Sequence, residues 1–293
     1  MLAYIAHRIS EQPFDRALVQ TQLARVSYWA WWLAGLVLLM PLNWGLEARK
    51  WQLLIEPVEA VSFAAAYQAV LAGTSLGFAL PAIVGDAAGR VLPLRSGNRA
   101  GGVAASLVSG GLQFFVAVGF GAMAWAWQVV SVPERNTVSG RVLLALLVSM
   151  TLTGVLLLLI RPNIRAVNLP RVGRFALPPL ATLPVPLAFA ALRYLTFSLQ
   201  FYAALNLYGL ALPVADAAAG IGLVFLAKTI TPAFNVLSDL GVREAAALWV
   251  FAPYNLPAPV LIVATLTLWA ANVLLPVLLG LVWVWRLNST RNQ

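Results

Sequence analysis

Long apolar stretches, separated by short polar segments, run along almost the whole chain. A helix needs about 20 apolar residues to cross the hydrocarbon core of a bilayer, and most of these stretches approach or exceed that length. The stretches predicted to be helical are residues 28–46, 60–80, 101–127, 142–160, 183–212, 215–237, 241–251 and 258–285. The pattern therefore predicts an all-α polytopic membrane protein with about six to eight transmembrane helices.

The composition agrees with this prediction. Of the 293 residues, 61% are hydrophobic and 10% are charged, whereas a soluble domain needs more charge to cover its surface. The excess of 19 Lys and Arg over 10 Asp and Glu lies in short loops, where it fits anionic lipid headgroups better than nucleic acid. The chain has no Cys, and His7 is its one histidine, which excludes thiolate chemistry and a histidine-based triad. We expect no metal and no cofactor.

The charges also predict the organisation of the chain. A cytoplasmic or interfacial arm is expected at residues 1–27, a single transmembrane domain at 28–286 and a C-terminal tail at 287–293. The arm is polar before any long apolar run, which does not fit a cleaved signal peptide, so we expect the first apolar stretch to be an uncleaved anchor. Lys and Arg in the short loops favour a cytoplasmic N-terminus.

Proline and glycine break two of the apolar stretches. The breaking residues are Pro81, Gly85, Pro232 and Gly241. Irregular backbone at membrane depth is tolerated only where it is buried in protein or lines a cavity, so both places are predicted to be re-entrant segments. Their positions in the two halves of the chain are consistent with an inverted repeat.

An Asp–Arg pair with four-residue spacing accompanies each break. The pairs are Asp86–Arg90 and Asp239–Arg243, and Glu244 follows the second. Such spacing is typical of a simple intrahelical ion pair, and this alternative stays open. Beside a helix break, freed backbone N–H groups suit a phosphate, and Arg90 and Arg243 are candidates to bind it. The three carboxylates are candidates to position these cations or to carry a coupling proton.

Lys228 lies inside an apolar stretch. A charge at the bilayer centre costs about 2.5–3.5 kcal/mol, so such residues usually face a partner or a watery cavity. Thr231, Asn235 and Ser238 follow Lys228 at helical spacing and extend a polar stripe. The stripe indicates a substrate path with Lys228 and Asn235 as binding residues. A structural pair with a carboxylate such as Asp86 is the alternative.

Arg193 is the last candidate for substrate binding. It lies near the start of the stretch 183–212, with Gln200 further along the same face. An arginine so close to a helix end can also snorkel to the headgroups, so both interpretations stay open.

Two further patterns bear on packing. The polar run at residues 47–51, which follows the first apolar stretch, is predicted to be an interfacial connection. Gly102, Ser106 and Gly110 recur every four residues, and Gln113 extends their face. Small residues allow close helix approach, so this face is expected to point into the bundle.

Three runs of sequence resemble a known family. They are LNWGLEARKW, SFAAAYQAVLAGTSLGFALPAIVGDAAGR and LGVREAAALWVF. Within them, a P-x-x-x-G-[DE]-x-x-x-R pattern is carried by Pro81, Gly85, Asp86 and Arg90, and a G-x-R-E pattern by Gly241, Arg243 and Glu244. Over residues 28–285 the chain resembles the flippase-like membrane region of the lysylphosphatidylglycerol synthases. Ser238-Asp239-Leu240 replaces the paired glycines usual before the late motif, which implies a different headgroup.

The resemblance implies a lipid flippase of the bacterial cytoplasmic membrane that moves a charged phospholipid or polyprenyl-linked lipid between leaflets. The expected partner is an anionic phospholipid or polyprenyl-phosphate lipid, and a homo-oligomer is an open alternative. The aminoacyl-transferase domain of the synthases has no counterpart in the sequence, so synthesis of lysyl-lipid is not expected. A membrane-embedded lipid-modifying transferase and a non-transporting scaffold subunit are the two alternative functions.

Overall fold

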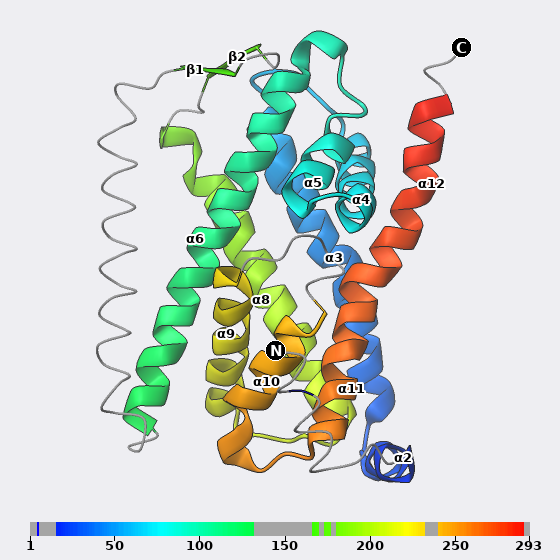
Figure 1. The fold of residues 1–293 in the computed structure, drawn as a ribbon, viewed down its shortest axis with the longest axis vertical. Coiled ribbons are helices and arrows are strands. Elements are labelled where there is room, and N and C mark those ends of the chain that lie inside the picture. Colours follow the sequence, from blue (N-terminus) through cyan, green and yellow to red (C-terminus); the bar gives the residue numbers. More distant parts are fainter. Residues whose placement is uncertain are drawn as a thin grey trace. The chain divides into compact units, whose positions relative to one another are not determined.

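The computed structural model describes Ile5 and residues 16–131, 166–169, 173–176, 180–231 and 240–289. In this part of the chain the fold is all-α, as predicted, with one short antiparallel hairpin (Figure 1). The helices are α2 (Arg16–Arg25), α3 (Trp29–Ile55), α4 (Phe63–Ala79), α5 (Ala82–Arg90), α6 (Arg99–Ser131), α8 (Pro184–Leu207), α9 (Val214–Ile230), α10 (Val242–Val250), α11 (Ala258–Trp269) and α12 (Leu275–Ser289). The hairpin pairs β1 (Ala166–Leu169) with β2 (Gly173–Ala176).

Three helical stretches among the described residues are long and apolar enough to cross a membrane. They are Trp29–Ile55, Ser96–Gln128 and Ala258–Arg286, and the last contains a π-helical turn at Ala270–Leu274. An all-α membrane protein is therefore confirmed. The predicted helix at residues 142–160 lies outside the described residues, and the number of crossings stays a prediction.

The chain divides into two compact units. The first contains Met1–Pro41, Ala117–Leu146 and Leu195–Asn272, and the second contains Leu42–Val116, Leu147–Tyr194 and Val273–Gln293. Helices α9, α10 and α11 belong to the first unit, and α4, α5 and α12 belong to the second. The predicted division into an arm, one transmembrane domain and a tail stays a prediction.

A helix break separates α4 from α5 in the second unit. The Oγ of Ser62 accepts a hydrogen bond from the N–H of Ala65 at 3.2 Å and caps the start of α4. Leu80 is extended, as expected for a residue before proline, and Pro81 stands directly before α5. The predicted break at Pro81 is therefore present.

Glycines allow α5 to lie directly against α4. An added Cβ at Gly85 or Gly89 would overlap the backbone of α4. The opposite side of α4 contacts α12 in the same manner, because a Cβ at Gly280 would overlap the backbone of α4 as well. The Oγ of Ser75 donates a hydrogen bond to the carbonyl of Val277 at 2.6 Å and fixes this second contact. In a bilayer the hydrophobic effect contributes little to helix association, because the lipid tails are as apolar as the side chains. Close backbone packing and interhelical hydrogen bonds hold the helices together instead.

The first unit contains a second helix–break–helix pair of the same dimensions. Helices α9 and α10 have 17 and 9 residues, as α4 and α5 do. Helix α9 ends where Thr231 becomes extended, and α10 begins after Gly241, whose φ of 93° favours glycine. Pro232 lies outside the described residues. The equal lengths support the predicted repeat, whereas re-entry into the membrane stays a prediction.

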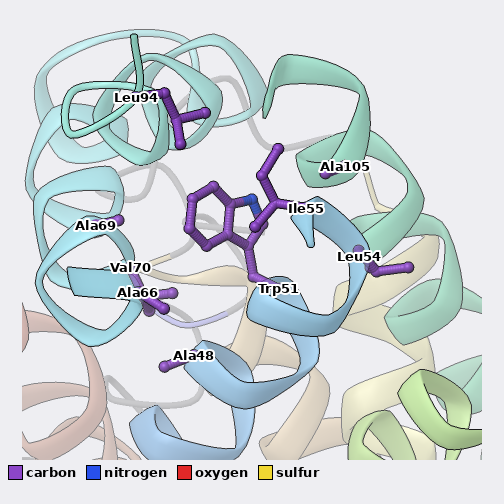
Figure 2. Close-up of a cluster of buried hydrophobic side chains, with 9 residues drawn as sticks. All are labelled: Ala48, Trp51, Leu54, Ile55, Ala66, Ala69, Val70, Leu94 and Ala105. Carbon is purple, nitrogen blue, oxygen red and sulfur yellow. The ribbon is translucent and has the colours of Figure 1, made fainter. Parts of the chain in front are cut away.

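The interfacial connection predicted at residues 47–51 is wrong. Helix α3 continues through these residues to Ile55, with Pro41 inside it. The indole of Trp51 is completely buried, and its Nε1 donates a hydrogen bond to the Oγ of Ser106 at 3.2 Å. Figure 2 shows Trp51 in an apolar cluster with Ala48, Leu54, Ile55, Ala66, Ala69, Val70, Leu94 and Ala105. The two buried charged residues of this run, Glu47 and Lys50, remain in the helix because partners within the protein satisfy their charges.

The small-residue face of α6 also differs from the prediction. Gly102 and Ser106 are buried, but Gly110 is exposed, and a Cβ added there would meet no other atom within 4 Å. Ser109 is buried in its place. A helix has 3.6 residues per turn, so a strict four-residue spacing drifts around its axis. The packed face of α6 therefore follows positions 102, 106, 109 and 113.

The α4–α5 contact predicts opposite effects for two glycine substitutions. Gly89→Ala should lower the free energy of unfolding by about 1–3 kcal/mol, because the added methyl group has no space against α4. Gly110→Ala is the matched control and should be neutral or slightly stabilising, because its site is open. Thermal unfolding in detergent, followed by circular dichroism, measures both. Equal melting temperatures for the two variants would contradict the packing of α5 on α4.

Candidate functional site

Charged side chains from three helices meet in the second unit. Glu47 and Lys50 lie on α3, Asp86 and Arg90 on α5, and Arg193 on α8. Helix α6 adds polar side chains at positions 109 and 113. We call these seven residues the Glu47 cluster. Glu47, Lys50 and Arg90 are buried, which is unusual for charged residues unless they are paired.

Glu47 is the centre of the cluster. Its Oε1 lies 2.8 Å from Nη1 of Arg90 and accepts a hydrogen bond from the Ser109 hydroxyl at 2.9 Å. Its Oε2 lies 2.7 Å from Nζ of Lys50 and 3.3 Å from Nε of Arg193. Both oxygens therefore face positive charge, which offsets the cost of burying a carboxylate.

Lys50 is fixed by more than its charge. Its Nζ donates hydrogen bonds to the carbonyl of Ser109 at 3.2 Å and to Oε1 of Gln113 at 3.4 Å. The amide of Gln113 in turn donates to the carbonyl of Ala190 on α8 at 3.4 Å. Together with Glu47, these contacts use the three donors of the ammonium group.

Arg90 joins two carboxylates. It is the last residue of α5, where a cation interacts favourably with the helix dipole. Its Nε lies 2.9 Å from Oδ1 of Asp86, one turn earlier, and its Nη1 reaches Glu47. The glycine-mediated contact with α4 sets the position of α5 and so holds Arg90 at this point. The intrahelical Asp86–Arg90 pair that the spacing indicated is present.

The cluster carries more positive than negative charge. Three cations, Lys50, Arg90 and Arg193, face two carboxylates, Glu47 and Asp86, which leaves one positive charge in excess. The side chains of Asp86 and Arg193 are each 32% exposed, so the cluster is not sealed. Such an arrangement can bind an anion.

The structure brings together three of the residues predicted from sequence, Asp86, Arg90 and Arg193. Glu47 and Lys50 were missed as site residues. The sequence nonetheless contains a helical signal, because Asn43, Glu47 and Lys50 are spaced four and three residues apart and so share one face of a helix. In the structure all three side chains are buried on α3. Their position after an apolar stretch favoured an interfacial segment instead.

The first unit holds other predicted residues. The carboxylate of Glu244 accepts a hydrogen bond from the N–H of Gly241 at 2.6 Å and so occupies the N-terminus of α10. Arg243 is completely buried, and its guanidinium carbon lies 6.0 Å from the centre of the Phe197 ring. Among the described residues, no group of three or more His, Cys, Asp and Glu could hold a metal ion.

Lys228 differs from its prediction in one respect. It lies half-buried in the last turn of α9 rather than in mid-helix, and α9 ends two residues later. The stripe from Lys228 through Thr231 is therefore not one continuous helical face. Asn235 and Asp239 lie outside the described residues, and their roles stay predictions.

The cluster predicts that its carboxylate is worth more to stability than its ammonium. Glu47→Gln leaves Lys50, Arg90 and Arg193 facing Asp86 alone, and it should lower the free energy of unfolding by about 3–5 kcal/mol. Lys50→Gln brings the cluster to zero net charge and should cost clearly less. Thermal unfolding in detergent measures both, with exposed Glu56→Gln as a control expected within about 0.5 kcal/mol of wild type. If Glu47→Gln is as mild as Lys50→Gln, the cluster does not depend on its carboxylate.

Comparison with known protein families gives a match over most of the chain. The family model for the lysylphosphatidylglycerol synthase TM region matches residues 6–280. No curated protein and no solved structure matches the chain. The family and the long apolar helices identify a multi-pass membrane protein linked to lipid handling. The chain belongs to the family of the lysylphosphatidylglycerol synthase transmembrane region.

Proposed function

We propose that this protein is a lipid translocase, which moves a charged phospholipid or polyprenyl-linked lipid between the leaflets of the bacterial cytoplasmic membrane. The observation that carries the proposal is the Glu47 cluster. Five charged side chains gather in a helical membrane protein, and three of them are buried. Charges inside a membrane protein are costly and commonly mark a substrate or ion path.

The shape of the cluster supports binding rather than mere packing. A purely structural cluster of charged residues would be expected to balance its charges, whereas the Glu47 cluster has one positive charge in excess. Two of its members, Asp86 and Arg193, are also partly exposed. Arginine and lysine are the usual ligands of phosphate. Under this proposal Arg193 holds the headgroup phosphate, and Arg90 and Lys50 contribute to its binding as fixed positive charges behind Arg193.

The two helix–break–helix pairs supply the second support. Transporters built from repeats bind their substrate where discontinuous helices end near the bilayer midplane. Within the first unit, taken by itself, we assign Lys228, Asn235 and Arg243 to headgroup binding. Glu244 already occupies the N-terminus of α10, so a phosphate there would depend on side-chain cations rather than on free backbone amides.

The carboxylates take the supporting role. Asp86 and Glu244 contact Arg90 and the start of α10, respectively, and we assign them and Asp239 to positioning these elements or to proton coupling. The sequence contains no phosphate-binding loop of the G-x-x-x-x-G-K-[ST] type. Transport is therefore proposed to be downhill or ion-coupled. The distribution of Lys and Arg in the loops supports a cytoplasmic N-terminus.

A translocation assay tests this proposal. The purified protein is reconstituted into vesicles that contain either fluorescent phosphatidylglycerol or fluorescent polyprenyl phosphate, and a membrane-impermeant quencher reports movement between leaflets. At least one probe should move faster than in protein-free vesicles. Failure of both probes to move with correctly folded protein would contradict the proposal.

Substitution of Lys228 separates transport from a scaffold role. Lys228→Gln removes a half-buried cation and should slow translocation by about tenfold or more, the loss expected for a charge-assisted hydrogen bond. Arg49→Gln is the control, because Arg49 is exposed on α3 and outside the Glu47 cluster, and it should move lipid at the wild-type rate. A wild-type rate for Lys228→Gln would remove this residue from the proposed site.

A further inference from the structure

The three cations of the Glu47 cluster are not equivalent. The side chains of Lys50 and Arg90 are 1% and 8% exposed, whereas that of Arg193 is 32% exposed. Lys50 and Arg90 each have a second partner, but among the described residues the Arg193 guanidinium pairs with Glu47 alone. Arg193 is therefore the member that an incoming ligand can reach.

The Arg193 contact is also the weakest of the three. Its Nε lies 3.3 Å from Oε2 of Glu47, against 2.7 and 2.8 Å for Lys50 and Arg90, and it makes no hydrogen bond of good geometry among the described residues. If Arg193 turns away, Glu47 keeps Lys50, Arg90 and the Ser109 hydroxyl. Exchange of Arg193 between Glu47 and a ligand therefore leaves no carboxylate unpaired.

The charge count decides which ligand fits. A phosphodiester that binds Arg193 brings the net charge of the cluster from plus one to zero. An aminoacylated headgroup such as that of lysylphosphatidylglycerol, with two ammonium groups and one phosphate, would raise it to plus two. Asp86 offers little relief, because its carboxylate is held by Arg90 at 2.9 Å. Like charges repel strongly where water is largely excluded.

We propose that Arg193 is the docking cation for the lipid phosphate, and that the excess charge of the Glu47 cluster selects anionic lipids and rejects aminoacylated ones. The selection rests on the proposed function, because it names the substrate class of the same site. It concerns the headgroup alone, so phosphatidylglycerol and a polyprenyl phosphate share the chemistry that Arg193 recognises.

Competition between defined lipids tests the selection without requiring transport. The full chain in mild detergent is mixed with equal amounts of phosphatidylglycerol and lysylphosphatidylglycerol, and native mass spectrometry counts the bound lipid of each kind. Wild type should favour phosphatidylglycerol by about tenfold or more. A second mixture of phosphatidylglycerol with polyprenyl phosphate shows which anionic lipid binds more tightly.

Variants assign the preference to Arg193. Arg193→Gln should reduce the preference for phosphatidylglycerol severalfold or more, and Arg193→Lys, which keeps the charge, should retain most of it. Arg49→Gln should behave as wild type. Unchanged elution in size-exclusion chromatography and unchanged helical content show that each variant is folded. We expect the Arg193 variants to fold, because the Arg193 side chain is partly exposed.

The two proposals fail in different ways. Equal binding of both lipids by wild type, or an unchanged preference in Arg193→Gln, overturns the selection even if vesicles show lipid movement. Preferential binding of phosphatidylglycerol that depends on Arg193 supports the selection, and absence of movement in the vesicle assay would then count against translocation alone.

Discussion

The packing of the second unit depends on the ion pairs of the buried Glu47 carboxylate. This carboxylate binds cations from its own helix α3, from α5 and from α8, and it accepts a hydrogen bond from α6. Lipid provides little hydrophobic drive to hold helices together, so such polar contacts gain weight beside close packing. The glycines of α5 and the apolar cluster around Trp51 place the helices so that these side chains meet.

The same arrangement connects stability to function. Lys50 and Arg90 are enclosed and well partnered, and they maintain a positive potential behind the more open Arg193 and Asp86. Under the proposed function, such fixed charges would attract a headgroup without being displaced by it, which suits a site that must release its ligand. The family assignment gives this chemistry a lipid context, and the paired 17- and 9-residue helices in each unit resemble the discontinuous helices of repeat transporters.

Much of this architecture could be predicted from the sequence, because long apolar stretches and proline breaks are local signals. The all-α membrane class, the break at Pro81 and the Asp86–Arg90 pair follow from such signals. The role of Glu47 could not be predicted in that way. A charged run after an apolar stretch has the same local appearance in an interfacial loop and in a helix whose partners lie on α5 and α8.

Two smaller differences have the same origin. The end of α9 near Lys228 and the exposure of Gly110 depend on where a helix stops and how its faces rotate against neighbours. Residue spacing predicts which side chains share a helix face only if the helix continues through all of them and the spacings alternate between three and four residues. Tertiary contacts decide both conditions.

Thiol labelling of the cysteine-free chain tests most directly whether the Glu47 cluster is a headgroup site. Ser109→Cys places a thiol beside Glu47, and Ala105→Cys places one at similar burial one turn earlier on α6, within the apolar cluster. In vesicles, a membrane-impermeant maleimide should label Ser109→Cys but not Ala105→Cys, because a transport cycle must open the charged site to water. Equal resistance of both thiols, from either side of the membrane and with phosphatidylglycerol present, would show the cluster to be a closed structural core.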